Sequence, residues 1–178
     1  MGPGAQPEAV RVVPYDPDWP ARFSAERRLL QAAIGAWVSG GVHHVGSTAV
    51  PGLDAKPIID ILVGVRDLAG SRACFEPLAE LEYSYAPYRV EEMHWFCKPD
   101  PRRRTHHLHL VPSDSPRYRA ELAFRDRLRQ RPELAARYGR LKQELASSFR
   151  QDRERYTRAK GAFIKRALRE LEPSDPQA

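Results

Sequence analysis

The chain has 178 residues, 42% of them hydrophobic, and a formal net charge of +6, so it can bury one core and we expect one domain. Charged residues interrupt the apolar runs well before they could span a bilayer, and the polar, Pro- and Gly-rich start lacks the pattern of a signal peptide. The cysteines, Cys74 and Cys97, have no metal-binding or redox spacing, which is typical of reduced thiols in a cytoplasmic protein without a membrane partner.

The first third of the chain predicts a short strand and a helix. We expect residues 1–9 to be disordered and residues 10–13 to form a strand. Asp18 is suited to cap the helix that follows, because a carboxylate can accept the free N–H groups of the first turn. Apolar residues at helical spacing extend this helix to about residue 38, and the pair Gly40-Gly41 ends it.

Residues 43–65 predict a short strand, a Gly-Ser turn, a loop with a Pro-Gly turn, and a second, strongly apolar strand. Asp60 lies inside that second strand, where a lone buried carboxylate costs several kcal/mol unless something pairs with it. A metal ion, a lysine or a position at the strand end would each remove this cost. By alternation we expect Asp60 to face a cleft with Leu62, and Ile59 and Ile61 to face the opposite side.

The turn before that strand predicts a phosphate site. Gly46 lets a backbone approach a ligand closely, and Ser47 and Thr48 add hydroxyls and N–H donors that suit phosphate oxygens. Lys56, in the loop before the second strand, is placed to pair with Asp60 or to meet a substrate phosphate, and a plain surface lysine fits the pattern equally well.

The remaining elements give an α+β domain over residues 10–171. Asp67 is placed to cap a helix that runs to about Glu82, and a flexible tail covers residues 172–178. The predicted strands cover 84–90, 94–98 and 105–111, and the predicted helices cover 116–129, a stretch that opens at Pro132, and about 152–171.

Two histidines share one face of the strand at 105–111. His107 and His109 are two residues apart and therefore lie on the same side, with Thr105. Two imidazoles on one sheet face suit a divalent metal ion or phosphate oxygens, while a solvated polar face is the alternative. By the same alternation His44 lies on the same face as Gly46. If the two strands lie next to Asp60, we expect His44 to complete a cluster with Asp60, His107 and His109.

The positive charge is concentrated in the C-terminal part. Residues 1–116 contain 12 basic and 14 acidic residues, a balance of −2, whereas residues 117–170 contain 17 and 7, a balance of +10. This favours an anionic partner such as a nucleotide, a CoA-like molecule or a nucleic acid, although arginine used as a solubilising cation explains it equally well. The candidate ligand-binding side chains here and in the basic turn before the histidine strand are Arg104, Arg125, Arg129, Lys142, Tyr156 and Lys160. An ion-pair network with Asp126 and Glu144 explains the helical members without a ligand.

These residues resemble the GrpB family, also called UPF0157, over almost the whole chain. The matching stretches are residues 15–19, 44–53, 56–60, 105–109, 124–129, 141–142, and the pair Tyr156 and Lys160. The family is similar in fold to nucleotidyltransferases, in which a Gly-Ser turn precedes a strand carrying two metal-binding acids one residue apart. Gly46, Ser47 and Asp60 match that pattern, but Leu62 occupies the position of the second acid. Some bacteria fuse a GrpB-like domain to dephospho-CoA kinase.

The resemblance implies a nucleotidyltransferase-like mixed β-sheet with flanking helices and a C-terminal helical half. The leading functional prediction is a nucleotide-dependent transferase that uses a nucleoside triphosphate, or another phosphorylated small molecule, and an unidentified acceptor. Its catalytic residues would be Asp60, His107 and His109, which with His44 would hold Mg²⁺, Mn²⁺ or Zn²⁺. The phosphates would be bound by Gly46, Ser47, Thr48, Lys56, Arg104, Lys142, Tyr156 and Lys160. A non-catalytic nucleotide- or CoA-binding module is the main alternative, and nucleic-acid binding by the basic helices is the weakest.

Overall fold

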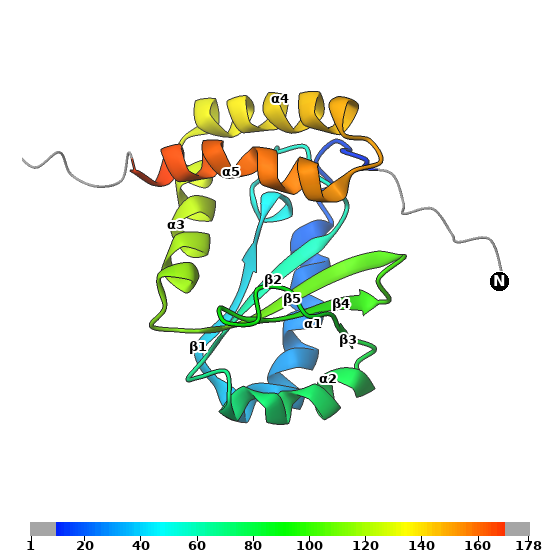
Figure 1. Ribbon diagram of the computed structural model, residues 1–178, viewed down its shortest axis with the longest axis vertical. Coiled ribbons are helices and arrows are strands. Elements are labelled where there is room, and N and C mark those ends of the chain that lie inside the picture. The colour runs from blue at the N-terminus through cyan, green and yellow to red at the C-terminus, as the bar shows by residue number, and fades with distance from the viewer. Residues whose placement is uncertain (1–9, 170–178) are drawn as a thin grey trace, which may run out of the picture.

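A five-stranded mixed sheet forms the centre of the computed structural model, which describes residues 10–169 (Figure 1). In spatial order the strands are β1 (Val38–Val45), β2 (Ile59–Val65), β5 (Arg104–Pro112), β4 (His94–Pro99) and β3 (Ser84–Tyr85). β2 and β5 run parallel, and the other neighbouring pairs are antiparallel. The helices are α1 (Trp19–Ile34), α2 (Phe75–Glu80), α3 (Pro116–Gln130), α4 (Pro132–Ser148) and α5 (Arg153–Arg169). The expected α+β class is confirmed.

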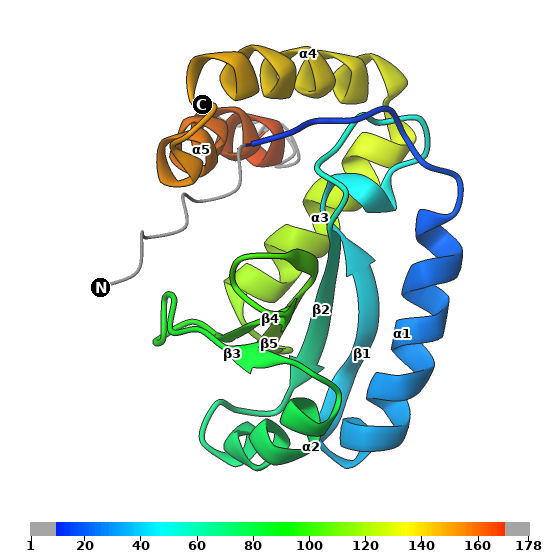
Figure 2. The same ribbon diagram turned by 90° about the vertical axis from the view of Figure 1, so that its right-hand side faces the viewer.

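The strict alternation of β2 gives the sheet two different faces. Ile59, Ile61 and Val63 pack into the main core against α1, whereas Leu62 packs on the other side with Tyr118 of α3. The helices α4 and α5 lie beyond the end of the sheet at which β1 ends and β2 begins (Figure 2). Asp60, near the start of β2, therefore lies under the helical half of the molecule.

The first helix ends earlier than its apolar spacing predicts. α1 stops at Ile34, a 3-10 turn follows at Gly35–Trp37, and β1 begins at Val38. Gly40 and Gly41 lie inside β1 and do not end the helix. The reason is packing, since a Cβ on Gly40 would come within 2.7 Å of the Tyr118 hydroxyl.

Three other expectations are corrected. Residues 10–13 form no strand, because only Val13 makes a bridge, to Ala55. The helix expected up to Glu82 is split into a 3-10 segment (Gly70–Cys74) and α2. The strand expected over 84–90 stops at Tyr85, and Pro87 soon after it has no N–H to donate to the ladder.

The other strands and the C-terminal helices match the expected ranges closely. The expected disorder of residues 1–9 and the tail from residue 172 lie outside the described residues. Within residues 10–169, the structure contains no helix with the length and apolar character needed to cross a membrane.

Candidate functional site

Asp60 and His107 form a hydrogen-bonded pair on the sheet face covered by α3. The two residues are direct partners in the parallel ladder between β2 and β5, so their side chains leave the sheet side by side. The Nδ1 atom of His107 lies 2.9 Å from Oδ1 of Asp60. The exposed fractions of the side chains, 30% for Asp60 and 19% for His107, mean that solvent reaches the edge of the pair.

The electrostatics of the pair determine which of its atoms carries the shared proton. Burial raises the pKa of Asp60, but the hydrogen bond and charge of His107, with His109 and Lys160, outweigh it and hold that pKa below its usual value. Burial also lowers the pKa of His107, against the opposing effect of Asp60. At neutral pH the pair is thus a carboxylate and a neutral imidazole. A carboxylate only accepts, so Nδ1 donates to Asp60 and Nε2 carries the lone pair.

That Nε2 atom is buried and has no hydrogen-bond partner among the described residues. The half-exposed ring of Trp95 packs beside the His107 imidazole, with 5.0 Å between the ring centroids. A buried acceptor without a partner is uncommon in native proteins. The orientation of His107 therefore leaves a proton-accepting atom that no described side chain or backbone group uses.

His109, the next residue on the same face, pairs with an acid of its own. Its Nδ1 atom lies 3.3 Å from Oε2 of Glu121 on α3, and Arg117 contacts the other oxygen of that carboxylate at 2.9 Å. Burial raises the pKa of Glu121, but His109 and Arg117 outweigh it and hold the pKa below its usual value. Sequence reasoning missed Glu121, because nothing local indicates that α3 crosses the histidine strand.

The C-terminal helical half places a cation near Asp60, beside one from the loop before β2. Tyr156 on α5 is buried, and its ring is flanked by the ammonium groups of Lys56, 4.2 Å from the centroid, and Lys160, 4.5 Å from it. Burial lowers the pKa of Lys160 and the negative charge of Asp60 raises it, so this lysine lies within electrostatic reach of the carboxylate. Lys56, Tyr156 and Lys160 therefore come together near Asp60 from distant parts of the chain.

The Gly-Ser turn lies against the carboxylate. Gly46 has φ 70°, and a Cβ there would lie 2.3 Å from Oδ2 of Asp60, so only glycine fits. Ser47 acts as a hydrogen-bonding neighbour of the buried phenol of Tyr138 on α4. Thr48 points the other way. Its buried hydroxyl donates to the carbonyl of Ile58 and bonds to His44, so the expectation that this hydroxyl meets phosphate is wrong.

His44 does not belong to the Asp60 cluster, which corrects its assignment as a metal ligand. Val45, and not His44, is the direct partner of Asp60 in the antiparallel ladder. The His44 imidazole is on the α1 side, stacked on Phe23 with 4.8 Å between centroids. Burial there lowers its pKa to about 4, so the ring is neutral.

The three expected metal ligands on this sheet face are each paired with a neighbouring side chain. Asp60 and His107 bind each other, and His109 binds Glu121. Within residues 10–169 no group of three or more His, Cys, Asp or Glu side chains is arranged to hold a metal ion. The metal centre that the sequence predicts at Asp60, His107 and His109 therefore stays a prediction.

Two of the expected phosphate-binding cations have other contacts. Lys142 is buried, and its ammonium donates to the backbone carbonyl of Asp54, which ties the loop to α4. Burial lowers the pKa of Lys142 to about 7. The guanidinium carbon of Arg104 lies 5.1 Å from the ring centroid of Trp95, the ring that packs beside the His107 imidazole.

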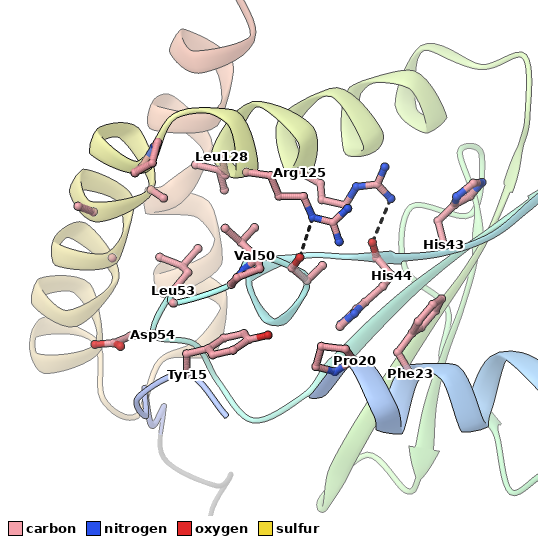
Figure 3. Close-up of a pocket in the computed structure, with 18 of the residues that line it drawn as sticks. Tyr15, Pro20, Phe23, His43, His44, Val50, Leu53, Asp54, Arg125 and Leu128 are labelled. Atoms are coloured by element: carbon pink, nitrogen blue, oxygen red, sulfur yellow. Dashed lines mark hydrogen bonds between the residues drawn. The ribbon is translucent and has the colours of Figure 1, made fainter. Parts of the chain in front are cut away.

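A groove of about 900 Å³ lies on the other side of the Gly-Ser loop and does not include Asp60 (Figure 3). Tyr15, Phe23 and His44 line one part of it, and Leu53 and Leu128 line another. No local sequence pattern predicts this groove, because its walls come from separate helices and a loop.

Comparison with known proteins shows the family. The family model described as GrpB protein matches residues 9–170, so this chain belongs to the GrpB family. A UPF0157 protein of Pseudomonas aeruginosa is 40% identical over 169 residues, which cover 92% of this chain and 68% of that protein. The crystal structure of the conserved protein GrpB from Enterococcus faecalis superposes with a TM-score of 0.81 at 34% identity, covering 90% of this chain and 96% of that one.

A partial match extends to a larger protein. A dephospho-CoA kinase of Mycolicibacterium paratuberculosis is 38% identical over 96 residues, which cover 52% of this chain and 23% of that protein.

Proposed function

We propose that the protein binds a phosphorylated ligand of the nucleotide class at the Asp60 site and transfers a phosphoryl or nucleotidyl group from it to a hydroxyl-bearing acceptor. The Asp60–His107 pair carries this proposal. A buried imidazole oriented by an ionised carboxylate, with an unpartnered Nε2 atom, is the arrangement of a general base.

In the transfer, Nε2 of His107 takes the proton of the acceptor hydroxyl. The acceptor oxygen forms a bond to phosphorus, and the bond from phosphorus to the leaving phosphate oxygen breaks. Asp60 keeps Nδ1 protonated and stabilises the imidazolium that forms. Lys160 and Lys56, which flank Tyr156, neutralise the charge that develops on the phosphate oxygens.

Two observations support a nucleotide-class ligand. The Gly-Ser turn precedes the acid-bearing strand as in nucleotidyltransferases, and a Cα without side chain faces the carboxylate at Gly46. In addition, a protein named dephospho-CoA kinase contains a stretch that is similar to this chain. Leu62 replaces a second acid and the expected ligands are each paired with a neighbouring side chain, so no step is assigned to a metal ion.

A non-catalytic module that binds the same ligand is the second candidate, favoured by the enclosure of Nε2 next to Trp95. A thermal-shift screen of nucleotides and CoA species, with and without Mg²⁺ or Mn²⁺, tests both candidates, because a ligand that binds the native state raises apparent stability. Phosphorus NMR of the best ligand with hydroxyl acceptors then separates them. We expect stabilisation by a nucleotide and its slow conversion. Stabilisation without conversion in wild type would favour the binding module, and no stabilisation would contradict both.

The His107→Ala, His109→Ala double variant is the matched test of the imidazoles. We expect it to fold and to lose nucleotide stabilisation. Equal stabilisation of the double variant and wild type would leave the histidines as an ordinary polar strand face.

A further inference from the structure

The groove beside the Gly-Ser loop has the size of a small-molecule site and takes no part in the transfer proposed above. Its volume of about 900 Å³ is within the usual range for ligand pockets. α1 forms one wall, α3 and α4 form the other, and residues 49–54 form the floor. Neither Asp60 nor His107 is among the lining residues.

The walls carry an excess of positive charge. Four arginines line the groove from three different helices, namely Arg27, Arg125, Arg129 and Arg140. Asp54 is the single acid in the lining, and its carboxylate accepts a hydrogen bond from Gln143 at 2.7 Å. Because like charges repel, this excess of guanidinium groups favours an anionic ligand in the groove.

Most of these guanidinium groups keep free donors. Arg125 is engaged with Asp126 and with the carbonyl of His44. Arg129 donates Nε to the carbonyl of Ala49 and its Nη1 atom lies 3.9 Å from the Asp126 carboxylate, while 40% of the side chain stays exposed. In the described part of the chain, Arg27 and Arg140 make no ion pair or side-chain hydrogen bond.

The groove also offers apolar surface. Val50, Leu53 and Leu128 are buried residues of the second core cluster that reach the floor, and Tyr15 and Phe23 border it from the α1 side (Figure 3). A ligand that matches both features has a carbon skeleton and several negative charges. The planar fork of arginine matches phosphate oxygens in pairs.

We infer that this groove binds a phosphate-bearing small molecule, with its phosphates on Arg27, Arg129 and Arg140 and its carbon skeleton on the apolar floor. The inference stands whether or not the Asp60 site carries out a transfer. The site differs from the Gly-Ser turn, because the loop between them presents Gly46 to Asp60 and Ala49 to the groove.

Calorimetric titration with pyrophosphate and with adenosine diphosphate, at constant moderate salt, tests the site. The test variant is Arg27→Ala with Arg140→Ala, and the control is Arg28→Ala with Arg137→Ala, which removes exposed cations from the same two helices outside the groove. A steric variant, Ala136→Trp, fills the groove from α4 without changing charge. We expect the test pair and the steric variant to weaken binding about tenfold or more, and the control pair to leave it unchanged.

The two probes distinguish the ligand's source: tighter binding of adenosine diphosphate than of pyrophosphate supports a ligand with a ring on the floor, and equal binding supports phosphate recognition alone. Equal weakening of both arginine pairs would reduce the effect to net charge and overturn the inference. The inference would also be overturned if Asp60→Asn abolished binding and the groove variants did not, or if wild type bound neither probe. Two further titrations serve as controls. Citrate that bound as tightly as pyrophosphate, or binding of RNA and of neither small probe, would overturn the inference as well.

Discussion

Asp60 is the residue on which the proposed chemistry depends, because its charge sets the state of His107. The carboxylate raises the pKa of the imidazole, in opposition to burial, and accepts its Nδ1–H, with 2.9 Å between Nδ1 and Oδ1. The turn at Gly46 leaves room for the carboxylate only because glycine has no Cβ. Both relations can be tested without knowing the ligand.

The first prediction concerns the proton of His107. Asp60→Asn removes the charge that raises the pKa of this imidazole, so the pKa should fall further below the usual histidine value. Proton NMR titration of the imidazole signals measures it. Asp54→Asn is the matched control, because Asp54 contacts Gln143 and not His107. A His107 pKa that is the same in wild type and Asp60→Asn would show that the pair is not formed.

The second prediction compares two glycines with positive φ. Gly52→Ala meets nothing within 4 Å, so it should cost about 1–2 kcal/mol of unfolding free energy from backbone conformation alone. Gly46→Ala has a similar φ but a ψ of −170°, a combination that is essentially restricted to glycine, and its Cβ overlaps Asp60 in addition, so it should cost about 1–3 kcal/mol more. Urea unfolding of both variants gives the difference. Equal costs would contradict the close packing of Asp60 on the turn.

At the level of elements, α5 brings the cations to the site. The ammonium groups of Lys56 and Lys160 both lie over the buried ring of Tyr156. One face of α5 therefore directs an aromatic ring and an ammonium group toward the edge of the sheet. Tyr156 and Lys160 are four residues apart, a spacing that predicts a shared helix face. The sequence could not show that this face lies over Asp60, because α5 begins 88 residues after β2 ends.

The third prediction tests Lys160. Lys160→Met keeps the length of the side chain but removes its charge, so nucleotide affinity measured by calorimetry should fall about tenfold. Lys165→Met makes the same change at an exposed position of α5 and should leave affinity unchanged. Similar affinities of the two variants would remove Lys160 from the binding site.

The packing of β1 on α1 gives the fourth prediction, on pH. The folded pKa of His44 is about 4 against 6.5 for an unperturbed histidine, because burial lowers it. As the pH falls, the unfolded chain therefore binds the proton before the folded chain does. The contribution of neutral His44 to the free energy of unfolding is complete above pH 6.5 and is lost as the pH falls toward 4. The loss should approach about 3 kcal/mol.

Urea unfolding across this pH range checks the effect, with His44→Gln as the comparison. The variant should show a shallower decline in unfolding free energy between pH 6.5 and 4, because glutamine does not titrate. Parallel curves for wild type and variant would mean that His44 is solvated in the native state.

The positions of single side chains followed from the sequence wherever strand alternation decides them. Asp60 and Leu62 share a face, as do His107 and His109, because the period of a strand is two residues. Alternation failed between His44 and Gly46, because Gly46 has left the strand with φ 70°. The direct pairing of Asp60 with His107 follows from the register of two strands 47 residues apart, which no local pattern fixes.

At the scale of the whole molecule, the sheet and the helical half contribute different parts of the proposed site. The sheet supplies the Asp60–His107 pair, α3 supplies Glu121, and α5 supplies Lys160. The groove on the other side of the loop adds a second cationic surface from α1, α3 and α4. Composition predicted that the C-terminal part is basic, but only the fold shows that its cations approach the sheet in two separate places.

Because the two places contain different histidines, NMR of histidine-labelled protein during nucleotide addition tests the central claim most directly. His107 lies in the Asp60 site, and His43 and His44 line the groove. If a nucleotide-class ligand binds at Asp60, the ring signals of His107 should shift with ligand concentration in wild type and should stay unchanged in Asp60→Asn. Shifts confined to His43 and His44, with His107 unaffected in wild type, would contradict the assignment of the Asp60 site as the place where the ligand binds and reacts.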